Sequence, residues 1–170
     1  MDGDPPQPTD MASTDAFDFS EVASGDEVSI DVKGRIVVSR ELREKLTEPF
    51  VLSRGEVGCL VIYPKPRWDV LVARVKKIDE FDPSRQAFER MVIGGAEAMR
   101  FDKQGRLPIP RDMRTFAKLE TGKARVVGLT QRVEVWSSKE YADYQLDPEG
   151  YNRPRREAIE RAYRTMMGQQ

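Results

Sequence analysis

Two stretches of the chain repeat the same order of apolar, polar and turn-forming positions. Residues 31–38 read DVKGRIVV and residues 102–109 read DKQGRLPI, so the two stretches align with an offset of 71 residues. Further along, LVIY at 60–63 aligns with VEVW at 133–136 with an offset of 73. A repeat of this kind indicates that the fold is built from two similar units. The pattern predicts a duplicated unit.

Alternating apolar and polar positions bounded by glycine-containing turns are typical of half-buried strands. In the first unit, this pattern predicts strands at 28–32, 35–38, 50–53 and 59–63, with a short helix at 40–46 that begins after Ser39. In the second unit, it predicts strands at 98–101, 106–109, 124–129 and 132–136, with a short helix at 111–117. The chain is therefore predicted to be mainly β with short helices, an α+β fold.

Helical spacing marks the segment that follows the strands of the first unit. Its apolar residues lie at positions i, i+3, i+4, i+7 and i+10, which form one face of a helix. They are Trp68, Leu71, Val72, Val75 and Ile78. This segment is therefore predicted to be a helix packed on the strands.

Other signals place further helix ends. Asp82, which precedes a proline, is typical of a helix start, and Gly94 is expected to end that helix. Ser137 and Glu140 have the spacing of a capping box for a helix in the second unit. A last helix is predicted at 155–167.

Charge is divided unevenly along the chain. Residues 1–27 carry eight of the 29 acidic side chains and no Lys or Arg, whereas all 28 basic residues lie from Lys33 onward. The remaining chain is therefore basic, although the net charge of the whole is −1. A basic face held at a fixed position can attract a polyanion despite an acidic arm. The acidic, proline-containing first 25 residues are predicted to be disordered.

Composition excludes several kinds of chemistry. Histidine is absent and Cys59 is the single cysteine, which rules out His-based triads, His-metal sites and internal disulfides. No stretch has the roughly 18 apolar residues of a membrane span, and the acidic start lacks the order of a signal peptide. We expect an intracellular protein that is not an enzyme, with no metal, cofactor, membrane or small-molecule substrate.

The doubled Asp-x-x-Gly-Arg turn carries the strongest functional signal. A single copy is usually a solvated hairpin, but two copies in register present two arginines in the same way. Glycine permits close approach to a groove, and a two-stranded ribbon fits the major groove of DNA. The arginines can donate to guanine edges or phosphates, and the lysines add point charges. The predicted DNA-binding residues are Lys33, Gly34, Arg35, Lys103, Gly105 and Arg106.

Arg43 and Arg114 occupy matched positions in the two predicted short helices. Either can reach a DNA phosphate. Equally, Arg43 can pair with Asp31 or Glu44, and Arg114 with Asp102, as structural anchors. Both interpretations are open from the residues alone.

The turn and the helix after it, DVKGRIVVSRELR at 31–43, resemble the AbrB-type swapped-hairpin DNA-binding motif. Three further runs are similar to the MraZ family: GCLVIYPKPRW at 58–68, FERMVIGGA at 88–96 with the second turn after it, and VGLTQRVEVW at 127–136. The resemblance covers roughly residues 26–145.

This resemblance implies a duplicated swapped-hairpin (double-split) β-barrel with a pseudo-twofold axis within one chain. The expected organisation is a disordered acidic arm at 1–25, half-domains at 26–93 and 94–146, and a C-terminal helical extension at 147–170. MraZ-like proteins form homo-oligomeric rings, bind G-rich direct repeats in double-stranded DNA upstream of the division and cell-wall gene cluster, and regulate its transcription. The resemblance therefore implies a cytoplasmic, nucleoid-associated regulator.

Carried over to this chain, the DNA-contacting arginines are Arg35 and Arg106, supported by Lys33 and Lys103. Two residues depart from those usual in the family: Ser39 stands in place of proline and Ala98 in place of glutamate. Together with the acidic arm, these departures leave a second interpretation open. In it, the chain is a non-catalytic ring scaffold that binds a protein partner rather than DNA.

Overall fold

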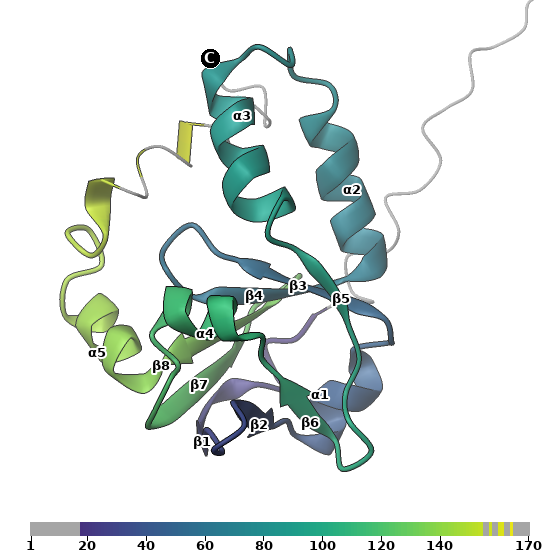
Figure 1. Cartoon of the computed structure of the whole chain (residues 1–170), viewed down its shortest axis with the longest axis vertical. Helices are drawn as coiled ribbons and strands as arrows, with labels where there is room; N and C mark the ends of the chain where they lie inside the picture. The colour runs from purple at the N-terminus through teal and green to yellow at the C-terminus, as the bar shows by residue number, and fades with distance from the viewer. Residues whose placement is uncertain (1–17, 155–156, 158–159, 162–163, 165–170) are drawn as a thin grey trace, which may run out of the picture.

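A six-stranded antiparallel sheet lies at the centre of the computed structural model (Figure 1), which describes residues 18–154, 157, 160–161 and 164. The strand order is β1-β7-β8-β4-β3-β5, and β2 and β6 form a separate two-stranded ribbon. The strands are β1 (Ser24–Ser29), β2 (Arg35–Val37), β3 (Phe50–Arg54), β4 (Leu60–Pro64), β5 (Glu97–Met99), β6 (Arg106–Pro108), β7 (Lys123–Gly128) and β8 (Val133–Ser137). The helices are α1 (Arg40–Lys45), α2 (Lys65–Val75), α3 (Pro83–Phe88), the π-helical turn η2 (Glu89–Ile93), α4 (Arg111–Ala117) and α5 (Ser138–Leu146). The prediction of a mainly β chain with short helices is confirmed.

The order of elements repeats along the chain. Two strands, a short helix, two strands and a helix occur first as β1 to α2 and again as β5 to α5, with α3 and η2 between them. The two copies are interleaved, because β1 pairs with β7, β2 with β6, β3 with β5 and β4 with β8. The expected closed barrel is not found in the described chain. There β1 and β5 end the sheet while β2 and β6 form their own ribbon, so the strand order does not close.

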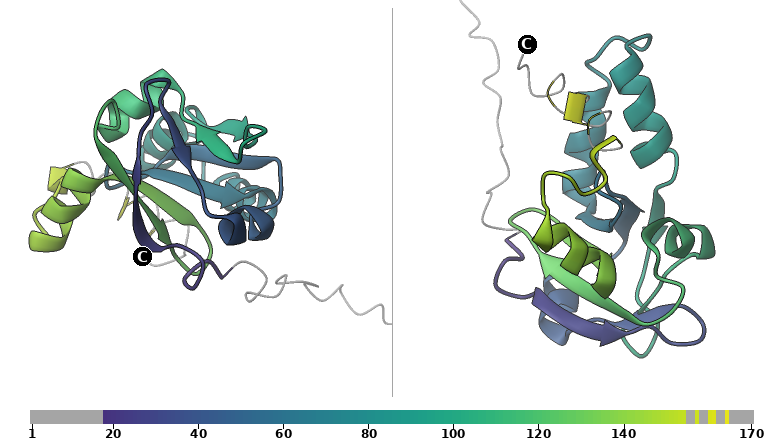
Figure 2. Two further views of the ribbon diagram at one scale, coloured as in Figure 1. Left: turned by 90° about the horizontal axis from the view of Figure 1, so that it is seen from below. Right: turned by 90° about the vertical axis from the view of Figure 1, so that its left-hand side faces the viewer.

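The sheet separates two apolar cores. Side chains alternate along β4, so Leu60 and Ile62 enter the first core and Val61 and Tyr63 enter the second. The first core lies between the sheet, the ribbon, α1 and α4, and the second lies under α2, α3 and α5. Cys59 is buried in the second core, and burial raises the pKa of its thiol. The helices α2 and α3 stand at one end of the molecule and the ribbon at the other (Figures 1 and 2).

Two of the predicted helix starts are confirmed by their hydrogen bonds. The Ser39 hydroxyl accepts from the backbone N–H of Leu42, at the start of α1. The Asp82 carboxylate accepts from the backbone N–H groups of Ser84 and Arg85, at the start of α3. Ser39 therefore caps α1 with its own side chain.

The predicted capping box at the start of α5 is wrong. Ser137 precedes the helix but its side chain makes no capping hydrogen bond, and Glu140 turns elsewhere. The Glu140 carboxylate accepts from Lys118 Nζ at 2.9 Å and from the Tyr151 hydroxyl. Burial raises the pKa of Glu140, but these hydrogen bonds outweigh burial and hold its pKa below the ordinary value. A buried carboxylate needs hydrogen-bonding partners that compensate its charge, and Lys118 and Tyr151 supply them here.

The folded chain begins before the predicted end of the acidic arm. Phe19 is fully buried in the first core, and its backbone N–H donates to the carbonyl oxygen of Leu129 at 3.0 Å. Residues 18–25 therefore belong to the fold, which corrects the last part of the predicted 1–25 arm. The free energy gained by burying the Phe19 ring holds this segment on the fold despite its acidic residues, because the acidic side chains can stay in water while the ring is buried.

Two sequence predictions fall largely on residues that the structure does not describe. Residues 1–17 of the acidic arm lie outside the described residues. So does most of the helix predicted at 155–167.

Candidate nucleic-acid interface

The ribbon of β2 and β6 brings the two Asp-x-x-Gly-Arg turns side by side. The strands run antiparallel, with Ile36 opposite Leu107, and both of these side chains are fully buried in the first core. Because side chains alternate along a strand, the neighbouring Arg35 and Arg106 lie on the outward side of the ribbon. Both arginines are partly exposed, at 23% and 25%.

Each turn is held by the aspartate at its start. Asp31 Oδ1 accepts from the backbone N–H groups of Lys33 and Arg35, both at 2.9 Å. In the second turn, Asp102 accepts the two corresponding bonds, again both at 2.9 Å. The two turns therefore share one geometry. The aspartates are absent from the predicted DNA-binding residues. Their equivalent positions in the two copies of the repeat nevertheless indicate that they share a role.

The same aspartates hold the arginines of the motif. Arg35 Nε donates to Asp31 Oδ2 at 2.7 Å, and Arg106 Nε donates to Asp102 Oδ2 at 2.8 Å. Two longer contacts cross the ribbon: Arg35 Nη1 lies 4.0 Å from Asp102 Oδ2, and Arg106 Nη1 lies 3.9 Å from Asp31 Oδ2. In these four side chains each aspartate contacts both arginines. We call Asp31, Arg35, Asp102 and Arg106 the four-charge cluster.

Both carboxyl groups of the cluster are ionised at neutral pH. The hydrogen bond from the Arg35 backbone N–H is the largest cause holding the pKa of Asp31 below its ordinary value of 3.8. Burial opposes this shift, but the further hydrogen bonds from the Arg35 side chain and the Lys33 backbone keep the pKa lowered. The pKa of Asp102 is lowered in the same way by Arg106. The ion pairs between these aspartates and the two arginines therefore persist across the physiological pH range.

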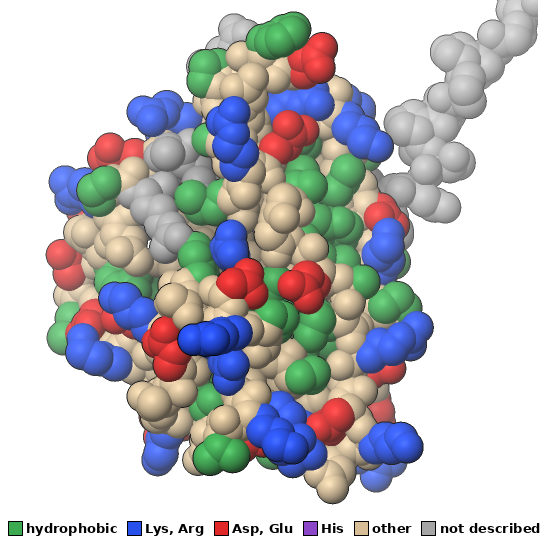
Figure 3. Space-filling model, in the orientation of Figure 1, with side chains coloured by type: hydrophobic (Ala, Val, Ile, Leu, Met, Phe, Trp, Pro, Cys, Tyr) green, Lys and Arg blue, Asp and Glu red, His purple; other side chains and the backbone are tan. Residues whose placement is uncertain are grey.

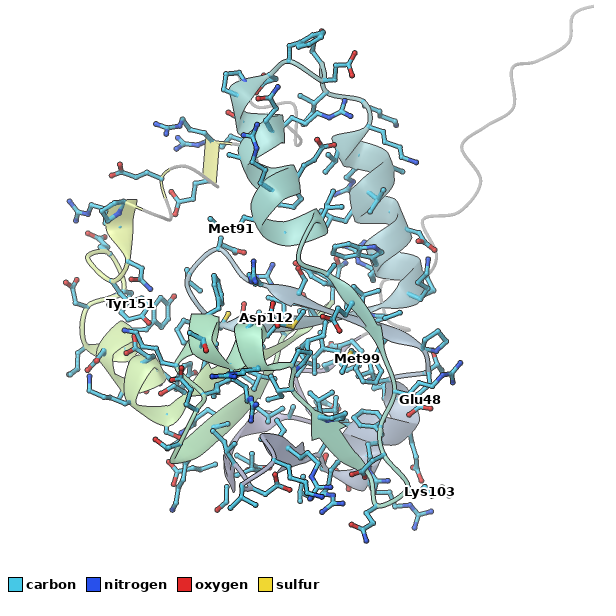
Figure 4. All side chains as sticks on the ribbon, in the orientation of Figure 1. Glu48, Met91, Met99, Lys103, Asp112 and Tyr151 are labelled. Carbon is cyan, nitrogen blue, oxygen red and sulfur yellow. The ribbon has the colours of Figure 1, made fainter. Side chains whose placement is uncertain are left out.

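The lysines of the two turns are exposed but do not occupy matched positions. Lys33 corresponds to Gln104 in the second turn, and Lys103 corresponds to Val32 in the first. Figure 4 shows Lys103 at the outer end of its turn, and Figure 3 shows Lys and Arg side chains along the edge of the molecule that carries β6 and α1. The turns thus present lysine charge at different points on the same surface.

Arg43 and Arg114 each lie over the turn of the other copy. Gly34 has a φ of +77°, and a Cβ added there would lie 1.7 Å from Arg114 Nη1. Gly105 has a φ of +74°, and a Cβ added there would lie 2.4 Å from Arg43 Nη1. Neither glycine can therefore be replaced without moving an arginine, and only glycine adopts this backbone conformation readily.

The anchoring partners expected for Arg43 and Arg114 are taken by other residues. Glu44 pairs with Arg40, at 2.7 Å, and the aspartates of the turns pair with the arginines of the motif. Arg43 Nε instead donates to the carbonyl oxygen of Val38 at 3.2 Å. We use the name turn surface for the residues Lys33, Gly34, Arg35, Arg43, Lys103, Gly105, Arg106 and Arg114.

Gly34→Ala is expected to lower the free energy of unfolding by about 2 kcal/mol or more. About 1–2 kcal/mol comes from the left-handed backbone conformation, and the rest from displacing Arg114. Urea denaturation measures the loss. Gly122→Ala is the matched control, because Gly122 also has a positive φ, +90°, but nothing lies within 4 Å of its added Cβ. In an Arg114→Ala background, the cost of Gly34→Ala should fall to that of the control; an unchanged cost would contradict the contact across the copies.

The chain is similar to known proteins over most of its length. The family model described as MraZ protein matches twice, at residues 22–91 and 92–161. Proteins named Transcriptional regulator MraZ are similar to the chain: 38% identity with that of Desulfitobacterium hafniense strain Y51 and 34% with that of Natranaerobius thermophilus, each over 71% of this chain and 84% of the relative. The protein of that name from Pelotomaculum thermopropionicum is 39% identical over 68% of this chain and 79% of its own length.

The class defined by these matches is that of transcriptional regulators, not enzymes. The chain belongs to the MraZ family. The resemblance seen in the sequence and the duplication of the unit are both confirmed, the latter because the family model matches each copy separately. Within the described residues, no helix is both long enough and apolar enough to cross a bilayer.

Proposed function

We propose that the chain regulates transcription by binding double-stranded DNA through its turn surface. The observation that carries this proposal is the pairing of β2 with β6, which sets two turns of one geometry side by side with their arginines facing outward. A two-stranded ribbon of this size fits the major groove. The proposed target is the one that the family resemblance implies, G-rich direct repeats upstream of the division and cell-wall gene cluster.

Within the turn surface, the residues have different proposed roles. Arg35 and Arg106 donate to guanine edges, because a guanidinium matches the two acceptors that guanine presents in the major groove. Lys33 and Lys103 contact phosphates from the exposed turns. Arg43 and Arg114 hold the opposite turn in place.

We further propose that the functional protein is a homo-oligomeric ring acting on the nucleoid in the cytoplasm. The four-charge cluster has no net charge, so one chain offers only a modest basic surface to DNA. Several copies on neighbouring repeats strengthen binding by avidity without a high charge on each copy. The interleaved pairing of the copies within one chain supports the swapped-hairpin arrangement that the family resemblance implies.

Fluorescence anisotropy with a labelled duplex from upstream of the chain's own gene tests the proposal. We expect tight binding whose affinity falls steeply as salt rises, because phosphate contacts release counterions. A duplex with the guanines of its repeats exchanged should bind more weakly. Absent binding would overturn the proposal and favour the ring scaffold with a protein partner.

DNA affinity is expected to be constant between pH 5 and 8 at fixed ionic strength. Histidine, the side chain that ordinarily titrates in this range, is absent. The pKa values of Asp31 and Asp102 are lowered below 3.8, so their contribution is complete above that pH and is lost only as the pH falls through the lowered values. Anisotropy titrations at several pH values measure this. A midpoint between pH 5 and 8 would contradict the assignment of these carboxylates to the interface.

A further inference from the structure

The four-charge cluster fixes each recognition arginine through one particular atom. Arg35 and Arg106 use Nε for the short hydrogen bond to the aspartate of their own turn, and Nη1 for the longer contact across the ribbon. A guanidinium is planar and carries its donors in a fixed fork. Holding Nε therefore fixes the direction in which Nη2 presents its two hydrogens. The aspartates thus set the aim of the groups proposed to meet DNA.

The cluster also joins the two turns. Asp31 Oδ2 lies 2.7 Å from Arg35 Nε and 3.9 Å from Arg106 Nη1, and Asp102 Oδ2 lies 2.8 Å from Arg106 Nε and 4.0 Å from Arg35 Nη1. Each carboxylate therefore contacts the arginines of both turns. The side chains are only 23–31% exposed, so solvent screens these contacts less than those of a fully exposed pair.

Resting on the proposed function, we infer that Asp31 and Asp102 are positioning residues that couple Arg35 and Arg106 into one DNA-reading unit. The aspartates themselves do not touch DNA in this arrangement. They hold both guanidinium groups in the orientation needed to donate to base edges. The two turns therefore contact the same side of the duplex together. Preorganisation of this kind increases affinity by reducing the ordering that binding requires.

The expected change in DNA affinity on removing Asp31 or Asp102 has the opposite sign to that expected from simple electrostatics. Removing a negative charge from a DNA-binding surface strengthens attraction to phosphates if charge alone matters. Removing Asp31 or Asp102 weakens binding if the carboxylate aims the arginines. The direction of the change therefore separates the two effects.

Asp31→Asn isolates the contact with the arginine. The amide oxygen can keep the two backbone hydrogen bonds of Oδ1, so the turn remains closed. The amide nitrogen replaces Oδ2 and faces Arg35 Nε, and two donors cannot bond to each other. Glu44→Gln is the matched control: it also removes one negative charge, and Glu44 lines the same hollow beside the second turn as Asp102 and Lys103.

Anisotropy on the upstream duplex tests the inference, with thermal unfolding to verify that each variant is folded. Asp31→Asn and Asp102→Asn are each expected to weaken binding about tenfold, the value of one well-oriented arginine–base pairing. They should also reduce the difference in affinity between the upstream duplex and its guanine-exchanged form. Glu44→Gln should bind as tightly as the unmodified protein, or slightly more tightly.

The same substitution in other backgrounds shows whether the aspartate acts through the arginines. In an Arg35→Ala background, Asp31→Asn should still weaken binding, by less than tenfold, because Asp31 also contacts Arg106. In the Arg35→Ala, Arg106→Ala double background, measured at low salt where residual binding is retained, it should have no weakening effect.

The outcomes distinguish this inference from the proposed function. If the unmodified protein binds DNA and the asparagine variants bind equally well or more tightly, the positioning role is wrong and the proposed function stands. If Asp31→Asn has no effect in the Arg35→Ala background, each carboxylate serves its own turn and the coupling is wrong. If the unmodified protein does not bind the duplex, both fall together.

Discussion

Replacing Arg35 and Arg106 together with alanine is expected to abolish sequence-specific DNA binding while the protein remains folded. Each arginine–base pairing contributes about 1–3 kcal/mol, so the loss of two is at least about 2 kcal/mol, or roughly 30-fold in affinity, for each chain. In a ring the loss is repeated at every copy, because the copies bind by avidity. Anisotropy on the upstream duplex, compared with the guanine-exchanged duplex, measures both the affinity and the preference.

A control of equal charge shows that the effect belongs to the turns. Lys76→Ala with Lys77→Ala also removes two positive charges, from exposed positions just beyond the end of α2. This end of the molecule lies opposite the ribbon (Figure 1). The control should keep nearly all of the affinity and the preference for guanine. Equal losses in the two double variants would mean that overall charge, not the turn surface, governs binding.

The fold of the double arginine variant is expected to persist. The Oδ1 atoms of Asp31 and Asp102 keep their hydrogen bonds to the backbone of the turns, and the buried face of the ribbon, with Ile36 and Leu107, is unchanged. Light scattering and thermal unfolding check this. Unfolding of the variant would show that the four-charge cluster is needed for stability.

Phe19→Ala is expected to lower the free energy of unfolding by about 3–5 kcal/mol, the usual cost of removing a fully buried aromatic ring. Phe19 has no exposed surface, and its backbone is bonded to Leu129 near the turn between β7 and β8. A Cβ added at Gly128 would lie 1.9 Å from the Phe19 carbonyl oxygen, so the segment is packed tightly on the end of β7. Urea denaturation measures the change.

Phe81→Ala is the matched control, because Phe81 is 77% exposed. Its replacement should change the free energy of unfolding by less than about 0.5 kcal/mol. A chain that starts at Asp26 should be less stable than one that starts at Asp18, because it lacks Phe19 and the beginning of β1. Equal stability of these two shortened chains would contradict the role of Phe19 in the core.

Local signals in the sequence predict helix starts well when only neighbouring residues decide the contact. The caps at Ser39 and Asp82 were predicted because a side chain and a backbone N–H a few residues away decide them. The capping box of Ser137 and Glu140 failed because Glu140 finds partners from α4 and from the segment after α5. A contact between residues far apart in the chain thus overrode a local pattern. The burial of Phe19 cannot be predicted from local sequence, because one aromatic residue in an acidic segment carries no periodic signal.

The two turns of the candidate site can be recognised in the sequence, but their contacts with each other cannot. The doubled Asp-x-x-Gly-Arg motif and the order of strands and helices follow from the sequence alone, because periodicity and turn residues encode local conformation and burial. The family follows from the resemblance of particular runs of residues to a known family. The tertiary structure alone decided that Arg43 and Arg114 cover the turn of the opposite copy, and that each aspartate contacts the arginines of both turns. These contacts depend on how the two copies interleave, and a residue some 70 positions away becomes a neighbour only when β2 and β6 pair.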